Sequence, residues 1–168
     1  AISFATGEYL ILASDDDTYS PGFLEQADKL LAAHPECDMV RARVAITNEK
    51  GETTDMEPRF DEHQSAEQFA FYLHRYGIRC ASNYIYRREA FLATGGFVKF
   101  PLAWYTDVAT PQVMAANGVL NMPEVAFCFR RSAIQLTHDN NLPTLKQKLD
   151  AMLLCWRWQQ EYFKTLKP

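Results

Sequence analysis

Apolar residues recur along this chain with two spacings, every second residue in some segments and every third or fourth in others, which predicts both strands and helices. The continuous apolar run at 9–13 predicts a buried strand over 8–13. Ser20 and Pro21 are typical of a helix start, and an apolar face continues from there to about His34. Alternation of apolar and polar residues at 39–47 predicts a strand with one exposed face.

The second half of the pattern begins with a clear helix start. Ser65 and Gln68 have the spacing of a capping box, and Gly77 is a suitable stop for the helix that follows. The other expected segments are a polar loop or edge segment at 52–62, a strand at 82–87, a helix at 88–94, an aromatic loop at 98–106, a helix at 107–116, a strand at 119–129, a loop at 130–142 and a helix at 144–166. No repeat, low-complexity tract or linker interrupts the pattern, so we expect one domain over 1–168.

The expected last helix carries a long apolar stripe. Its members are Leu145, Leu149, Met152, Leu153, Trp156 and Phe163. The helix also carries an aromatic cluster, for which packing in the core together with a contact in a homo-oligomer is the simplest interpretation; its members are Trp156, Trp158, Tyr162 and Phe163. A face for another partner or for a membrane surface is the alternative, although the helix is not strongly basic.

Composition narrows the class of protein. The chain has 168 residues, 48% of them hydrophobic, which is enough for one globular domain with a real core. The formal net charge of −4 argues against a general nucleic-acid-binding surface. No apolar run approaches the ~20 residues of a membrane span, and no signal peptide is visible. The chain opens at Ala1 without an initiator Met, so we expect a piece of a longer protein.

The four cysteines are widely spaced and have apolar neighbours. They are Cys37, Cys80, Cys128 and Cys155. None forms a CxxC pair, so a zinc knuckle is not indicated. Reduced core thiols are typical of a cytoplasmic protein, and attachment to the inner face of the membrane stays open.

The most informative local feature is the acidic triplet Asp15, Asp16 and Asp17, directly after the first expected strand. Three neighbouring carboxylates repel one another and are costly to desolvate without partners. Oxygen-preferring cations such as Mg²⁺ or Mn²⁺ remove that cost, and ligands gather at the carboxyl ends of strands in α/β proteins. A solvated turn or helix start is the alternative. The residues after the triplet do not fit an EF-hand.

Two blocks of the sequence together resemble a known family. The stretch Ala5–Asp17, followed by Pro21, resembles family 2 nucleotide-sugar glycosyltransferases of the GT-A fold. Asn83–Arg88, followed by Gly95-Gly96-Phe97, is similar to the acceptor-side segment of that family. The blocks occur in the family's order, and the resemblance spans about 5–135.

The resemblance implies an α/β fold with a GT-A-like mixed sheet flanked by helices. It implies an enzyme that moves a sugar, with inversion, from a nucleotide-diphosphate sugar to a hydroxyl acceptor. A UDP-sugar is the favoured donor, and a glycan or lipid-linked molecule the acceptor, in bacterial surface-polysaccharide biosynthesis. Because the family's opening strand is missing, the resemblance also implies a fragment truncated at its N-terminus.

The resemblance assigns roles to particular residues. Asp16 would hold the Mg²⁺ or Mn²⁺ ion. Asp15 would contact the ribose or the sugar phosphate, or would replace the carboxylate that is missing at Ser14. Asp107 stands at the place of the family's catalytic base, although its alternative is an ordinary helix-start residue. The sequence departs from the family at Ser14 and Thr106, where the family has carboxylates.

Four further residues are weaker candidates. Trp104 would stack on a sugar, although such a residue is more often part of a core. Arg130 and Arg131 would clamp the pyrophosphate, or form a solvated basic loop. We favour polar surface over a metal ligand for His138.

Two other functional classes remain open at this stage. One is a metal-dependent phosphotransferase or nucleotidyltransferase, although the chain has no GxxxxGK[ST] loop. The other is a non-catalytic fragment or binding module, which the two departures favour.

Overall fold

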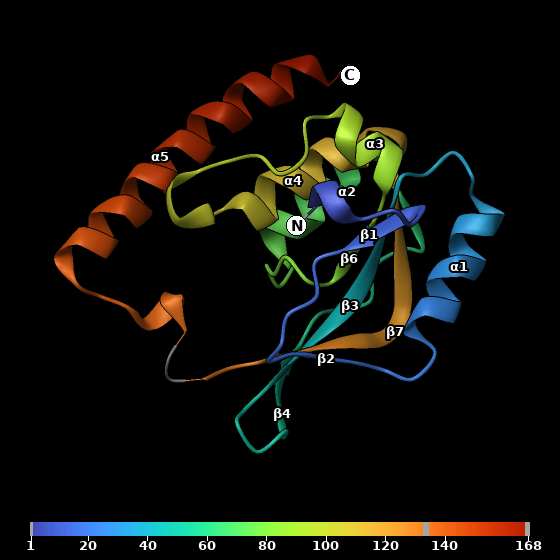
Figure 1. The fold of residues 1–168 in the computed structure, drawn as a ribbon, viewed down its shortest axis with the longest axis horizontal. Helices are drawn as coiled ribbons and strands as arrows, with labels where there is room; N and C mark the ends of the chain where they lie inside the picture. The colour runs from blue at the N-terminus through green and yellow to red at the C-terminus, as the bar shows by residue number, and fades with distance from the viewer. Residues whose placement is uncertain (1, 133–134, 167–168) are drawn as a thin grey trace.

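A seven-stranded mixed sheet forms the centre of the computed structural model, which describes residues 2–132 and 135–166 (Figure 1). The strand order is β1-β6-β3-β7-β2, with β4 added beside β3 and β5 beside β7. The strands are β1 (Tyr9–Ile11), β2 (Thr18–Tyr19), β3 (Met39–Thr47), β4 (Thr53–Met56), β5 (His63–Gln64), β6 (Tyr84–Arg87) and β7 (Val119–Arg130). The two long strands β3 and β7 run parallel, and every other pair is antiparallel. The expected α/β fold with a mixed sheet flanked by helices is therefore confirmed.

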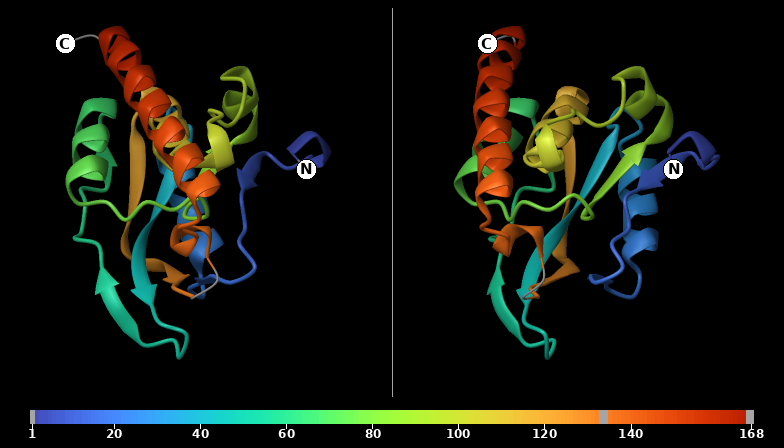
Figure 2. Two further views of the ribbon diagram at one scale, coloured as in Figure 1. Left: turned by 90° about the vertical axis from the view of Figure 1, so that its left-hand side faces the viewer. Right: turned by 60° about the vertical axis from the view of Figure 1, so that its left-hand side comes forward.

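Helices cover both faces of this sheet. The five α-helices are α1 (Phe23–Ala33), α2 (Ala66–Arg75), α3 (Arg88–Ala93), α4 (Thr106–Met114) and α5 (Leu142–Thr165). Short 3₁₀ turns lie at Ile2–Phe4, Pro101–Ala103, Ala115–Asn117 and Leu136–His138. Helix α1 packs on β3 and β7 from one side, α2, α3 and α4 lie on the other, and α5 crosses outside this second layer (Figures 1 and 2).

Successive side chains of β3 point to opposite faces of the sheet, and this alternation divides the core into two clusters. Val40, Ala42 and Val44 point toward α1 and pack with Phe23, Leu31 and Phe127. Met39 points to the opposite face, where a second cluster gathers around Phe69, Tyr84, Phe91 and Met114. Burial of apolar side chains on both faces, at roughly 25 cal/mol per Å², is the main force that fixes this strand in the centre.

The expectation of an exposed face on β3 was wrong. Eight of its nine residues are buried, and the side chain of Arg41 is 1% exposed. Arg41 forms an ion pair with the equally buried Glu57, and its guanidinium lies 5.0 Å from the centroid of Phe60. Alternation in the sequence identified the strand, but helices on both faces removed its solvent side.

The first strand also differs from expectation. Instead of a buried strand over 8–13, β1 is a three-residue edge strand that pairs with β6. Ile11 is 36% and Leu12 46% exposed. The apolar run is therefore present, but Tyr9 and Leu10 are only partly buried and Ile11, Leu12 and Ala13 are exposed.

Most predicted helices are confirmed. The capping box at Ser65 and Gln68 is present in full, and α2 ends two residues before Gly77. A Cβ atom at Gly77 would lie 2.9 Å from Leu73, so a side chain there would force a rearrangement. Helix α1 begins at Phe23, after Gly22 in a left-handed conformation, and not at the expected Ser20-Pro21.

The apolar stripe on α5 is exposed, and the expected core packing of the aromatic cluster is wrong for Trp156 and Phe163, whereas Trp158 and Tyr162 are partly buried. Leu145, Leu149, Met152, Leu153, Trp156 and Phe163 are each 41–57% exposed. The inner face is made instead by the buried Ala151 and Cys155 and by Tyr162, whose hydroxyl donates to the carbonyl of Gln112 at 2.5 Å. No helix within residues 2–132 and 135–166 is both long and apolar enough to cross a membrane.

Candidate active site

The acidic triplet lies in the connection between β1 and β2. Asp15 is exposed, and a carboxylate oxygen of Asp16 accepts a hydrogen bond from the Ser14 hydroxyl. An oxygen of Asp17 accepts a hydrogen bond of 2.9 Å from the backbone amide of Arg130, at the end of β7. Burial raises the pKa of Asp17, and this amide opposes the shift. The triplet is thus anchored to the end of a central strand through Asp17.

The three carboxylates do not form a ready-made cluster around one ion. Within the described parts of the chain, the one group of three potential ligands whose atoms lie within 4.8 Å of each other is found elsewhere. Asp15 and Asp16 remain accessible, which suits Mg²⁺, because that ion is usually held by one or two carboxylates and completed by phosphates and water. The donor chemistry of Asp16, oriented by Ser14, therefore fits such an ion.

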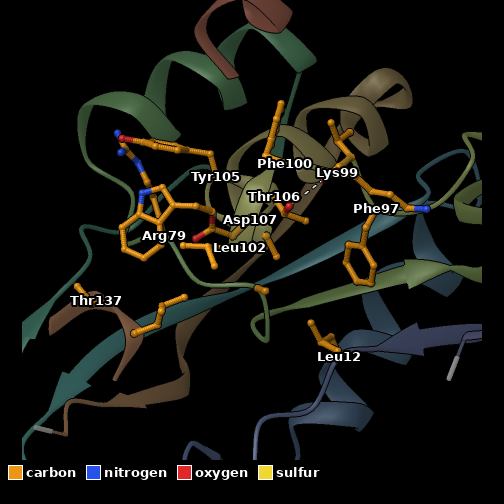
Figure 3. A pocket seen from close by; sticks show the side chains of 15 residues that line it. Leu12, Arg79, Phe97, Lys99, Phe100, Leu102, Tyr105, Thr106, Asp107 and Thr137 are labelled. Carbon is orange, nitrogen blue, oxygen red and sulfur yellow. Dashed lines mark hydrogen bonds between the residues drawn. The ribbon is translucent and has the colours of Figure 1, made fainter. Parts of the chain in front are cut away.

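A cavity of about 560 Å³ is lined by Asp107, and none of the three aspartates of the triplet lines it. Figure 3 shows Asp107 near the centre of the labelled side chains, with Thr137 to one side and Phe97 to the other. Leu12 brings the β1 connection to the same cavity, and Arg79 lines it from the loop after α2. Segments far apart in the sequence thus meet around one carboxylate.

Asp107 has the electrostatics of a proton acceptor. It lies in the first turn of α4, where the amides of Asp107 and Val108 stabilise its charge. Burial outweighs these amides and the positive charge of Arg79, so the pKa of Asp107 is raised. A raised carboxyl pKa brings the group closer to the range in which a base takes up a proton efficiently.

The loop before Asp107 is strained. Leu102, Ala103 and Tyr105 adopt left-handed backbone conformations with φ of 57°, 54° and 67°. For a residue other than glycine, this backbone conformation costs roughly 1–2 kcal/mol of free energy. Such strain persists where the surrounding structure imposes it, commonly at functional sites.

Thr106 explains how the loop is held. Its hydroxyl donates a hydrogen bond of 2.8 Å to the carbonyl of Val98, and the hydroxyl of Thr110 accepts one of 3.0 Å from the Val98 amide. Two threonines of α4 therefore fix the start of the aromatic loop. Thr106 therefore makes a buried structural hydrogen bond at this position.

Trp104 lines the same cavity as Asp107. Its indole is half-buried and lies edge-on to Tyr105, with centroids 6.4 Å apart. The ammonium of Lys148 on α5 lies 4.8 Å from the ring centroid. The indole is thus positioned by a cation–π contact.

The other candidates lie apart from Asp107. Arg130 is exposed, and its backbone amide anchors Asp17. Arg131 and His138 line a different, open hollow together with Asn48. The structure therefore brings together Asp107 and Trp104, and joins Arg130 to the acidic triplet.

Sequence reasoning did not single out Arg79 or Thr137. Both line the cavity, yet Arg79 lies in a loop and Thr137 in a short 3₁₀ turn, and neither segment has a recognisable motif. Only the proximity of Arg79 to Gly77, a helix stop, hinted that it begins a functional loop.

Comparison with known proteins supports the fold. No protein-family model matches the chain, and no curated protein matches it. Among solved structures, residues 1–349 of S. aureus TarS match with 13% identity and a TM-score of 0.56, over 77% of this chain and 37% of that one. The TarS complex with UDP-GlcNAc matches with 12% identity and a TM-score of 0.57, over 78% and 37%. The complex with UDP matches with 14% identity and a TM-score of 0.53, over 79% and 38%.

TarS is a glycosyltransferase, so this chain has a glycosyltransferase-like fold. The chain spans less than two fifths of the length of the 1–349 structures that it matches.

Proposed function

We propose that this chain is part of an inverting family 2 glycosyltransferase of the GT-A type that uses a nucleotide-diphosphate sugar. The observation that carries the proposal is Asp107, a carboxylate of raised pKa in an aromatic-walled cavity. That cavity lies in a glycosyltransferase-like fold and is reached by the connection that holds the acidic triplet.

Asp107 would act as the general base of the transfer. An acceptor hydroxyl oxygen forms a bond to the anomeric carbon, and the bond from that carbon to the phosphate oxygen breaks. The hydroxyl proton passes to Asp107, and the bonding electron pair leaves with the nucleoside diphosphate. Attack from the side opposite the leaving group inverts the anomeric centre. General-base assistance of this kind is worth roughly 10²- to 10⁴-fold.

The leaving pyrophosphate would be stabilised at the acidic triplet. Asp16 would hold a Mg²⁺ or Mn²⁺ ion, and Asp15 would contact the ribose or the sugar phosphate. A bound divalent ion supplies charge stabilisation to the leaving phosphates. The exposed Arg130 lies next to this loop through its amide contact with Asp17, so it is better placed than Arg131 to contact a phosphate.

The identity of the substrates is also part of the proposal. UDP is the favoured nucleotide, because TarS has been crystallised with UDP-GlcNAc and with UDP. The aromatic walls around Asp107, including Trp104, suit the apolar face of a sugar in a glycan or lipid-linked acceptor. We expect a cytoplasmic protein of polysaccharide synthesis, in which all four cysteines are free.

Among residues 2–132 and 135–166, no strand pairs with the outer edge of β1, which is compatible with further strands from a longer protein. Such strands would bury the exposed Ile11 and Leu12 and complete the nucleotide-binding half. This extension belongs to the proposal that the chain is an N-terminal truncation.

The test is calorimetric titration of UDP with and without Mn²⁺, into this chain and into the protein extended at its N-terminus. We expect Mn²⁺-dependent UDP binding by the extended protein, abolished by Asp16→Ala and retained by Asp150→Ala, an exposed aspartate on α5. Binding that is equal in both variants would refute the role of Asp16. Nucleotide hydrolysis without sugar transfer would favour a phosphotransferase, and no nucleotide binding by either form would favour a non-catalytic module.

A further inference from the structure

Four side chains with metal-binding atoms gather at the junction of α1, β3 and β5. They are His34 at the end of α1, Glu36 and Cys37 in the turn that follows, and His63 at the start of β5. One ligand atom each from Glu36, Cys37 and His63 lie within 4.8 Å of one another. His34 joins them, because its Nδ1 lies 3.2 Å from Oε1 of Glu36 and its ring stacks on His63 with centroids 5.7 Å apart.

The fold places these residues together by separate means. Helix α1 ends at His34, and the chain turns at Pro35 to enter β3. His63 is brought alongside because β5 pairs with β7, with His63 opposite Leu120. Gly118 then allows a close approach, since a Cβ atom there would lie 2.8 Å from Nε2 of His63. The imidazole of His63 therefore packs against the backbone of Gly118, where any larger residue would collide with it.

The donor set is selective for one class of metal. A thiol, two imidazoles and a carboxylate are ligands for zinc, whereas Mg²⁺ and Ca²⁺ prefer oxygen alone. Zinc bonds of about 2.0–2.3 Å put tetrahedral ligands about 3.3–3.8 Å apart. Among Glu36, Cys37 and His63 the separations of up to 4.8 Å therefore need to close by roughly 1 Å, and His34, which lies outside this group of three, needs a larger movement. Glu36 can make this movement, because its side chain is 60% exposed.

We propose that Glu36, Cys37 and His63, with His34 as the fourth ligand, bind a Zn²⁺ ion. On binding, the Cys37 thiol gives its proton to solvent and exchanges its hydrogen bond to the Asn117 carbonyl, 3.4 Å long, for a bond to the metal. Both imidazoles bind in their neutral form. The ion ties the α1–β3 turn to β5, which lies far along the chain.

This site is separate from the candidate active site. Its residue Cys37 lies two positions before the start of β3, and the neighbouring Gly118 directly precedes β7. The contact between Asp17 and Arg130 lies where β7 ends. The zinc site therefore has a structural role that is independent of glycosyl transfer.

Metal binding can be measured directly on the chelator-treated protein. We expect one Zn²⁺ per chain, measured by competition with a chromophoric chelator. We also expect Co²⁺ to give the strong near-ultraviolet absorption of a thiolate–metal charge transfer together with the visible bands of a tetrahedral ion. Zn²⁺ should raise the melting temperature, because it binds the folded chain preferentially.

Variants decide which residues bind the ion. Cys37→Ser should remove the charge-transfer band, and His63→Gln and His34→Gln should each weaken Zn²⁺ binding by at least roughly tenfold. Cys128→Ser is the matched thiol control and should bind as the unmodified chain does, as should Asp16→Ala. His63 and His34 are not buried, so their variants remain informative even where Cys37→Ser fails to fold.

Three results would overturn the proposal. The first is the absence of stoichiometric Zn²⁺ binding. The second is a Co²⁺ spectrum without a thiolate band. The third is an unchanged dissociation constant in His63→Gln or in His34→Gln. None of them depends on whether the protein transfers sugar.

Discussion

The carboxylate of Glu57 accepts a hydrogen bond from the guanidinium of Arg41 in the interior of the protein, where the two side chains are 0% and 1% exposed. Glu57 also accepts hydrogen bonds from the backbone amides of Val44 and Ile78. One buried carboxylate therefore ties β3 to the loop that leads directly to Arg79 in the cavity.

Removing the charge of Glu57 should destabilise the fold strongly. Glu57→Gln leaves Arg41 buried without its counter-ion, and breaking a buried pair in this way costs about 3–5 kcal/mol. Urea unfolding monitored by circular dichroism measures the change. Glu62→Gln, at an exposed position, is the control and should change stability by less than about 0.5 kcal/mol. Equal midpoints for the two variants would contradict the importance of the pair.

Asp107→Asn should separate activity from stability. Asparagine keeps the shape but cannot take up the acceptor proton, so we expect transfer by the extended protein to fall roughly 10²- to 10⁴-fold. Stability at neutral pH should not fall, because burial disfavours the ionised carboxylate that is removed. Assay of sugar transfer and thermal unfolding of the same samples test both statements. A variant that keeps full activity would remove Asp107 from the mechanism.

The raised pKa of Asp107 has consequences of opposite sign for activity and stability. Activity should fall as pH decreases through the raised pKa, because the base must be ionised. Stability should fall as pH increases from the ordinary carboxyl pKa to the raised one, because the folded state there binds more protons than the unfolded state. Asp17 has a raised pKa as well, so Asp107→Asn should reduce this slope without abolishing it. Unfolding free energies across this pH range, in both proteins, measure the slope, and an unchanged slope in the variant would contradict the assignment.

The strained loop makes a glycine substitution unusually favourable at Ala103. With φ at 54°, Ala103→Gly relieves strain that offsets the greater flexibility of glycine in the unfolded chain. We expect unchanged or slightly increased stability. Ala32→Gly, exposed in α1, is the matched control and should cost about 0.5–1 kcal/mol. A comparable loss at Ala103, by urea unfolding, would show that its left-handed conformation is not strained.

The exposed stripe of α5 is expected to pair with a second copy of the chain. Leu142, Leu145, Leu149, Met152 and Trp156 follow the alternating three- and four-residue spacing of a coiled-coil seam, and all are at least 42% exposed. An identical helix presents the same seam, so a dimer buries both.

Size-exclusion chromatography with light scattering should show a concentration-dependent dimer. Leu149→Glu should shift it to monomer. Leu24→Glu, at an isolated exposed apolar position on α1, is the control and should not. A monomer at all concentrations would exclude this pairing.

Much of the local structure followed from the sequence. The capping box at Ser65 located α2, and the aromatic loop before Asp107 was expected where it lies. These features depend on neighbouring residues, so a local pattern is sufficient to find them. The departure at Thr106 was visible in the sequence, but its bond to Val98 was not, because that bond requires the fold of the loop.

The sequence by itself determined the longer strands and helices in their order, the acidic triplet and the place of Asp107 at a helix start, but not the short strands β2 and β5. Periodicity, caps and motifs are local, and each is encoded within a few residues. Only the tertiary structure decided which faces are covered. It buried Arg41 on a strand that alternates like a half-exposed one, and it exposed the apolar stripe of α5. It also brought His34, Cys37 and His63 together, because strand pairing joins residues whose separation in the sequence carries no signal of contact.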